Sequence, residues 1–182
     1  MTTERNMLAD NREMAQRFIY ECWNIGKMET LWDMVAADCC LHDTAFPDAV
    51  TGPGSLARHI CSCRNGFPDM EFTIEDTIAE RNEVVLHWSA TGTHTGDYFG
   101  MKPTGKCAAI TGSSIFRFED GRIAEMWADW NAMYLLMQLG LMPQPPQQQS
   151  QVSQMQPLSE PLQIPVPAAI PRPILLGRGQ SI

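Results

Sequence analysis

Apolar residues recur at helical spacing in the first third of the chain. A first helix is predicted after Asp10, a residue that can cap a helix, and Gly26 stands where a helix commonly ends in a left-handed turn. The apolar positions of this helix fall on one side, at Met14, Phe18, Ile19 and Cys22. Residues 29 to 35 predict a short second helix, and residues 39 to 42 predict a strand. A third helix is predicted from Pro53 to about Gly66, because apolar residues recur there three and four positions apart.

From residue 72 onward the apolar period changes to two, which is typical of strands. Residues 83 to 91 predict a long strand with Val84, Leu86, Trp88 and Ala90 on one face. Residues 107 to 118 and 122 to about 131 predict two more strands, joined by a tight turn at Asp120 and Gly121. Helices followed by an antiparallel meander indicate an α+β fold.

The last predicted hairpin has a register that separates its two faces. If Phe118 faces Ile123 across the turn, Phe116 lies opposite Glu125 and Ser114 lies opposite Trp127. Strand parity then predicts one shared face, made of Phe116, Phe118, Ile123, Trp127, Asp129 and Asn131. This face is aromatic near the turn and polar at its far end, so it is suited to line a pocket. The opposite face carries Ile115, Ala124 and Met126. We expect copies of the chain to associate through this face into a homodimer or higher homo-oligomer.

Composition narrows the function classes. The 182 residues are 44% hydrophobic and carry a net charge of −8, with no basic run, which argues against nucleic-acid binding. No apolar run approaches the roughly 18 residues of a membrane span, and we expect a cytoplasmic protein that does not bind membranes. The six cysteines and four histidines have no metal-ligand spacing, so we expect free thiols and no metal or other cofactor.

The last 40 residues differ in character from the rest of the chain. Residues 143 to 182 contain nine of the thirteen prolines, a run of three glutamines and only three charged residues. The sequence therefore predicts a folded domain over residues 1 to 142 and a disordered tail over residues 143 to 182. The apolar cluster at residues 170 to 176 is either a docking segment for a partner or neighbouring subunit, or part of a dispensable extension.

The segment Gly92-Thr-His-Thr-Gly-Asp-Tyr-Phe-Gly-Met-Lys-Pro-Thr-Gly-Lys106 sets a histidine among glycines between two predicted strands. Glycine permits sharp bends and close backbone approaches, so His94 is predicted at the rim of a pocket, with Tyr98 in its wall. The simpler interpretation is a glycine-rich hairpin with an exposed histidine, and a further alternative is that His94 only bonds the loop backbone.

This segment resembles the GTHxGxxxGxxPTGK signature of the SnoaL-like polyketide cyclases, also called ester cyclases. Further matching motifs lie at family-like distances, at residues 67 to 69, 120 to 123, 125 to 127 and 138 to 140. The resemblance covers roughly residues 8 to 142. It implies a nuclear-transport-factor-like cone, in which a curved antiparallel or mixed sheet wraps around the N-terminal helices. It also implies a small, hydrophobic, carbonyl-rich substrate and a cofactor-free intramolecular aldol closure in which a carboxylate transfers the proton.

The chain departs from the family at one important position. Alignment on the closing Gln138-Leu139-Gly140 puts the family's catalytic aspartate at Asn131, and an amide is no general base. Three hypotheses remain: Asp129 is the base, a histidine such as His94 or His42 is the base, or the family's proton chemistry has been lost. In the last case the protein is a non-catalytic binding module with the same pocket.

The leading hypothesis is a cyclase or isomerase with Asp129 and His94 as catalytic residues. The predicted substrate-binding residues are His42, Tyr98, Phe116, Trp127 and Asn131. Neighbouring strand residues point to opposite faces, so only one of His42 and Asp43 can line the pocket. His59, on the third predicted helix, is interpreted as structural.

Overall fold

A computed structural model describes residues 2–143 of the chain. Helix α1, Thr2–Arg17, continues directly into the π-helical turn η1, Phe18–Ile25, and Gly26 ends it with a left-handed φ of 80°. The other helices are η2 Met28–Thr30, α2 Leu31–Met34, α3 Pro53–Gly66 and α4 Ala132–Leu139. The first helix starts earlier than the predicted cap at Asp10, and α4 was not predicted. The predicted tail lies outside the described residues, apart from its first residue.

Six strands form one mixed sheet. They are β1 Val35–Asp43, β2 Val50–Thr51, β3 Glu71–Glu80, β4 Glu83–Thr93, β5 Cys107–Glu119 and β6 Arg122–Trp130. Their order is β2-β1-β6-β5-β4-β3; β1 and β6 run parallel, and every other neighbouring pair is antiparallel. The predicted α+β fold is confirmed, with β2 as an additional short strand.

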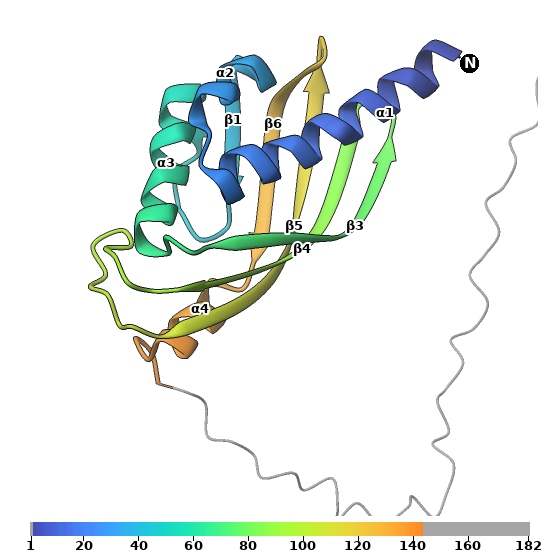
Figure 1. Cartoon of the computed structure of the whole chain (residues 1–182). Coiled ribbons are helices and arrows are strands. Elements are labelled where there is room, and N and C mark those ends of the chain that lie inside the picture. The colour runs from blue at the N-terminus through green and yellow to red at the C-terminus, as the bar shows by residue number, and fades with distance from the viewer. Residues whose placement is uncertain (1, 144–182) are drawn as a thin grey trace, which may run out of the picture. The chain divides into compact units, whose positions relative to one another are not determined.

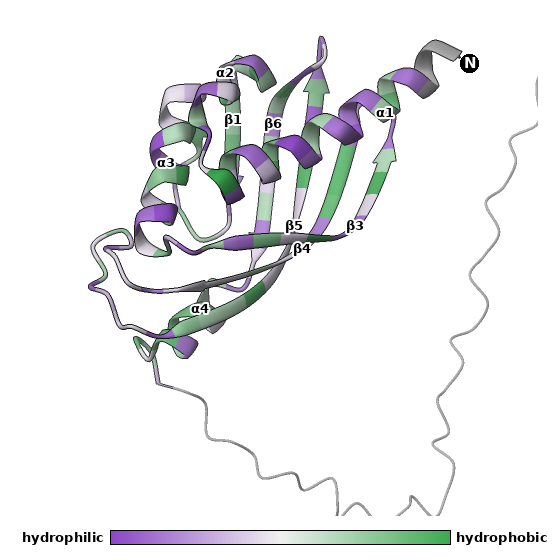
Figure 2. Ribbon diagram, viewed as in Figure 1, coloured by the Kyte–Doolittle hydropathy of each residue, from purple (hydrophilic) through white to green (hydrophobic). Residues whose placement is uncertain are grey.

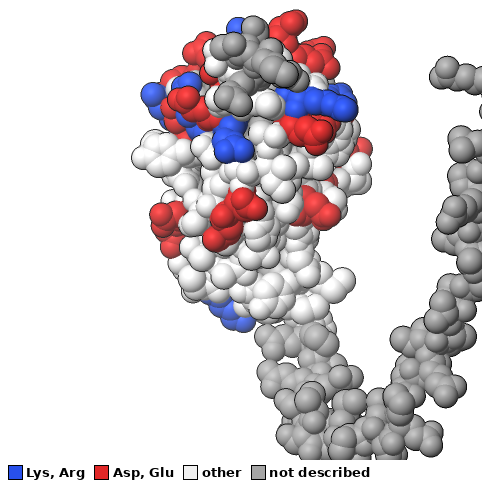
Figure 3. Space-filling view, turned by 90° about the vertical axis from the view of Figure 1, so that its right-hand side faces the viewer, with Lys and Arg blue, Asp and Glu red and all other residues white. Residues whose placement is uncertain are grey.

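The helices cover the concave face of this sheet (Figure 1). The main core joins Phe18 of η1 and Ile60 of α3 to inward residues of the strands, including Leu86 and Phe116. Figure 2 shows the alternation of hydrophobic and hydrophilic positions along the strands that this arrangement requires. On the face drawn in Figure 3, acidic and basic residues intermingle near one end and form no broad patch of a single sign.

A β-bulge corrects the predicted register of the last hairpin. Phe118 does lie opposite Ile123, but the pairing then shifts, and Phe116 lies opposite Met126 instead of Glu125. One extra residue on β6 reverses the parity of everything that follows it. Met126 therefore faces the core and is only 2% exposed, so its predicted place on the outer face is wrong.

Candidate active site

A cavity lies between the concave face of the sheet and the helices. It encloses about 930 Å³, including the space at its open mouth. Its wall is largely apolar and rich in aromatic residues, with Phe18, Trp23, Phe72, Trp88, Phe116 and Trp130 among the lining residues. Asp43 is the single charged residue among those that line it. The cavity therefore suits a flat, largely apolar ligand and offers it one carboxylate.

Asp43 is the last residue of β1, and its carboxylate is held in a fixed orientation. Its side chain is only 8% exposed. The Oδ1 atom accepts hydrogen bonds from the indole Nε1 of Trp130 at 3.0 Å and from the backbone N of Ala45 at 2.9 Å. Oδ2 has no hydrogen bond within residues 2–143 and lies 3.7 Å from Nε2 of His59. One oxygen is thus anchored, while the other remains available to accept a proton.

His59 projects from α3 toward Asp43 and is itself buried. Burial lowers the pKa of His59 below its ordinary value, and the nearby Asp43 charge opposes that shift only in part. His59 is therefore neutral near pH 7. Its Nε2 has no hydrogen-bond partner among the described residues, so a small movement would bring it within bonding distance of Asp43.

Tyr98 presents a second polar group to the cavity. Two glycines let its loop lie close to the end of α3: a Cβ on Gly66 would come within 2.6 Å of the Tyr98 Cβ, and one on Gly96 within 1.9 Å of the Asn65 carbonyl. Burial, with smaller contributions from Cys63 and Asp43, raises the pKa of Tyr98. The phenol therefore stays protonated and can donate a hydrogen bond.

Cys63 also lines the cavity but is unsuited to nucleophilic chemistry. Burial, reinforced by the Asp43 charge, raises the pKa of its thiol to about 12. The thiolate, which is the reactive form, is therefore scarce at neutral pH.

Among the predicted substrate-binding residues, Tyr98 and Phe116 line the cavity. Trp127 borders it as well, but its ring stacks on His42 at a centroid distance of 5.6 Å, on the other side of the sheet. Because Met126 and Ala128 occupy the inward positions on either side of Trp127, its backbone forms part of the wall and its ring faces outward.

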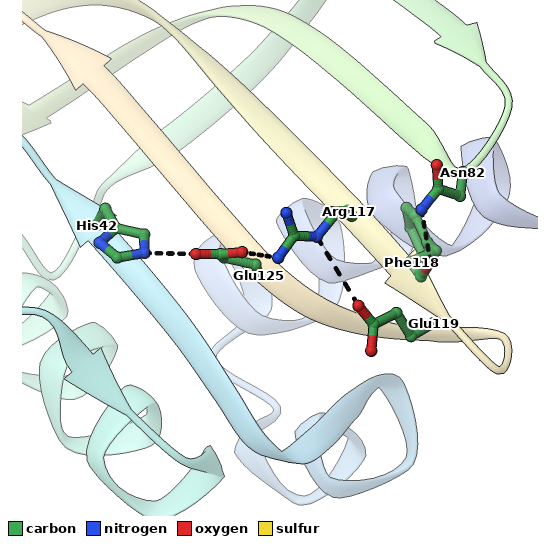
Figure 4. Close-up of polar contacts among 6 residues, drawn as sticks. All are labelled: His42, Asn82, Arg117, Phe118, Glu119 and Glu125. Carbon is green, nitrogen blue, oxygen red and sulfur yellow. Dashed lines mark hydrogen bonds and ion pairs between the residues drawn. The ribbon is translucent and has the colours of Figure 1, made fainter.

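His42 lies on the outer face, in a chain of polar contacts that crosses β1, β6 and β5 (Figure 4). Its Nε2 is 2.8 Å from Oε1 of Glu125, Glu125 is paired with Arg117, and Arg117 lies 3.9 Å from Glu119. The predicted placement of His42 in the pocket is therefore wrong. Its neighbour Asp43 lines the cavity instead. Asp43 is two residues after Leu41 on the same strand, so the two side chains point to the same face of the sheet.

Asp129 and Asn131 also lie outside the cavity. After the bulge, β6 directs Met126, Ala128 and Trp130 inward, so Asp129 is exposed on the outer face. Asn131 caps α4, where its Oδ1 accepts a hydrogen bond from the backbone N of Tyr134 at 2.9 Å. The predicted pocket positions of both residues are wrong, and the structure offers no support for Asp129 as the base.

His94 is completely buried and does not line the cavity. Its Nδ1 lies 3.2 Å from the Thr104 hydroxyl, its ring stacks on Phe67, and its backbone bonds Gly105 and Lys106. These contacts join the two ends of the glycine-rich loop. They fit the alternative in which His94 bonds within the loop that carries Tyr98, whereas its complete burial contradicts the interpretation of an exposed histidine.

Sequence reasoning missed Asp43, His59 and Trp130 as a group. The alternation of strand residues puts Asp43 on the same face as Leu41 and could have favoured Asp43 over His42 as the cavity residue. The contacts that join β1, α3 and β6 leave no signal in a short stretch of sequence. Within residues 2–143, no three His, Cys, Asp or Glu side chains are grouped so as to hold a metal ion. No helix in this part of the chain is both long and apolar enough to cross a membrane.

The sequence model of the SnoaL-like polyketide cyclases matches residues 13–139. The chain belongs to this family. No curated protein matches it.

Solved structures show a similar fold. A protein from Jannaschia sp. CCS1 described as a SnoaL-like polyketide cyclase is 21% identical, with a TM-score of 0.70 over 75% of this chain and 96% of its own. IdmH from Streptomyces antibioticus, described as a polyketide cyclase, is 29% identical, with a TM-score of 0.58 over 67% and 93%. A ketosteroid isomerase-like protein from Catenulispora acidiphila DSM 44928, in complex with trimethylamine, is 17% identical, with a TM-score of 0.62 over 73% and 98%. The SnoaL-like protein described here shares their cone fold.

Proposed function

We propose that this protein catalyses a cofactor-free ring closure or isomerisation of a carbonyl-rich, polyketide-like small molecule. In this proposal Asp43 replaces Asp129 and His94 as the proton-transferring residue. The observation that carries it is a single buried carboxylate, anchored through one oxygen, in the wall of an aromatic cavity.

The first step is removal of a proton beside a substrate carbonyl. The Asp43 Oδ2 atom has no hydrogen bond of its own within the described residues, and the neutral His59 beside it brings no positive charge. Because Oδ1 is held by two donors, Oδ2 keeps a fixed position from which it can accept the proton. The substrate C–H electrons pass to the carbonyl oxygen, and the proton passes to Asp43.

The second requirement is stabilisation of the resulting enolate oxygen. The Tyr98 hydroxyl stays protonated and has no hydrogen bond within residues 2–143, so it is a suitable donor. In an aldol closure, the enolate carbon then attacks a second carbonyl of the same molecule, and the proton held by Asp43 neutralises the new alkoxide. Aromatic walls that keep the chain folded supply the proximity that this step needs.

This proposal can be tested without knowing the natural substrate. The probe is 1-phenylbutane-1,3-dione in D₂O. NMR measures the rate at which its α-hydrogens exchange for deuterium, and the rate in buffer alone is subtracted. We expect Asp43→Asn to reduce the catalysed exchange by about 100-fold or more. Asp129→Asn is the matched control and should leave it unchanged. Normal exchange by Asp43→Asn would overturn the assignment of the base.

The second candidate function is a non-catalytic binding module with the same pocket. It is favoured by β6, which directs Ala128 rather than a carboxylate into the cavity, and by Asn131 at the family's aspartate position. Trp23, Trp88 and Trp130 line the cavity and report binding by fluorescence. Quenching by the diketone without catalysed exchange would favour this second function.

A further inference from the structure

The loop that carries Tyr98 ends in a tight turn with an unusual residue. Tyr98 and Met101 exchange both backbone hydrogen bonds, at 3.1 and 2.9 Å, so Phe99 and Gly100 are the two central residues. Their φ angles are 48° and 84°. Positive values at both positions are the pattern of a type I′ turn, which prefers Asn, Asp or Gly at the first position.

The β5–β6 hairpin provides a comparison within the same molecule. Its central residues, Asp120 and Gly121, have φ values of 49° and 74°, nearly those of Phe99 and Gly100. Asp120 suits this backbone, whereas an aromatic residue with positive φ is strained. Strain of this kind persists where the surroundings hold it in place, and it is concentrated at functional sites.

Burial of the Phe99 ring does not account for the strain, because the residue remains 41% exposed. Its ring instead packs against three others. The centroid of Phe99 lies 4.7 Å from Phe46, 4.9 Å from Tyr98 and 5.6 Å from His59. Phe46, from the loop after β1, reaches His59 as well, at 5.1 Å.

These two phenylalanines lie against the imidazole of His59, whose Nε2 is 3.7 Å from Oδ2 of Asp43. Neither phenylalanine lines the cavity, so they contact the Asp43–His59 pair and not a ligand in the cavity. The titratable group that acts on His59 is Asp43 from β1, and Asp43 in turn lies within electrostatic reach of Cys63 of α3 and Tyr98 of the loop. None of these groups is a cation, and Trp23 closes a further side at 6.3 Å.

We propose that Phe46 and Phe99 are positioning residues that shield the Asp43–His59 pair from water, and that the strained turn at Phe99 is retained for this purpose. A hydrated imidazole would take up a proton at higher pH, and the resulting cation would stabilise the Asp43 carboxylate. The shield thus keeps His59 neutral and free of a positive charge beside Asp43. The proposal rests on the proposed function only for the role of Asp43 as the base.

The test is the pKa of His59, measured by NMR titration of its imidazole signals and assigned with His59→Gln. Phe99→Asn removes the ring and supplies a residue that the turn prefers. We expect the pKa of His59 to rise by about half a unit or more toward 6.5. We also expect the Tm to stay unchanged or to rise by about 2–4 °C, because the strain is relieved. Phe99→Tyr should keep the wild-type pKa.

Arg81→Gly is the matched control, since Arg81 also has a positive φ, of 55°, but lies in the turn between β3 and β4. It should raise the Tm to a similar extent without moving the pKa of His59. An unchanged pKa in Phe99→Asn, or a Tm that falls by several degrees in the folded variant, would overturn the proposal. If Phe99→Asn fails to fold, Phe46→Ala gives the same measurement, and an unchanged pKa there would overturn it. Because the readout is a titration, failure of the diketone exchange leaves this result interpretable by itself.

Discussion

His42 and Asp43 are neighbours in β1, yet they belong to different environments. The His42 side chain is 41% exposed and pairs with Glu125 on the outer face, whereas that of Asp43 is buried in the cavity wall and held by neutral donors. Charge pairs in water contribute little, because solvent screens them and side-chain entropy opposes them. A buried carboxylate depends on each of its hydrogen bonds. The two faces of the sheet should therefore respond very differently to equivalent changes.

The largest difference is expected between Met126 and Ile115. Met126→Asp places a charge in the core and should destabilise the protein by about 3–5 kcal/mol or prevent folding. Ile115→Asp, on the outer face of β5, should change the free energy of unfolding by less than about 1 kcal/mol in the monomer. Urea denaturation followed by circular dichroism measures both. Similar losses for the two variants would contradict the register described above.

The outer face is also where we expect the homodimer, which stays a prediction. Ile78, Val85, Ile115 and Trp127 form a continuous row across four strands, and Ile78 and Ile115 are 62% and 37% exposed. We predict that Ile115→Asp converts a dimer to a monomer in sedimentation equilibrium. His87→Asp, on the same face but outside this row, is the control. A wild-type monomer at micromolar concentration would contradict the prediction.

A smaller contrast is expected between two tryptophans of β6. Trp130→Phe removes one of the two donors to Asp43 Oδ1 and should cost about 1–3 kcal/mol. Trp127→Phe makes the same change on the outer face, where its ring stacks on His42, and should cost less than about 1 kcal/mol. Chemical denaturation at pH 7 compares them. Equal costs would mean that the Asp43 hydrogen bond is not important for stability.

The pH dependence of stability should report on the buried side. The pKa of His59 is lowered in the folded protein, so the unfolded chain binds the proton more readily. Stability should therefore fall as the pH decreases through about 6.5, and continue to fall until the pH is below the folded pKa. His59→Gln should remove that part of the slope, as measured by urea denaturation between pH 5 and 8. An unchanged slope would show that another group is responsible.

The smallest effect is expected for the exposed network. His42→Ala removes the contact with Glu125 and should change the free energy of unfolding by about 1 kcal/mol or less, decreasing further in high salt. The catalysed diketone exchange should not change. A loss of the catalysed exchange would contradict this prediction and indicate that His42 takes part in the reaction.

The hydrophobic pattern was a good guide to individual elements. It correctly predicted α3 between Pro53 and Gly66 and the inward face of β4, because both depend on local periodicity alone. It failed on β6 beyond Ile123, where the bulge changes the parity of the strand without a glycine or proline to mark it. Asp129 was predicted in the cavity for this reason, and Ala128 occupies the inward position instead.

By itself, the sequence determined the type of most elements, the apolar side of those with regular periodicity, such as α3 and β4, and the membership of a family with a cone-shaped fold. Short-range steric preferences and helical or strand periodicity are enough for that. The pairing of Asp43 with His59 and Trp130 came only from the tertiary structure, which brings together a strand end, a helix and another strand end. Such contacts depend on strand register and on the packing of α3 against the sheet. Both are set by the free energy of the whole folded chain, so neither leaves a pattern in a short stretch of sequence.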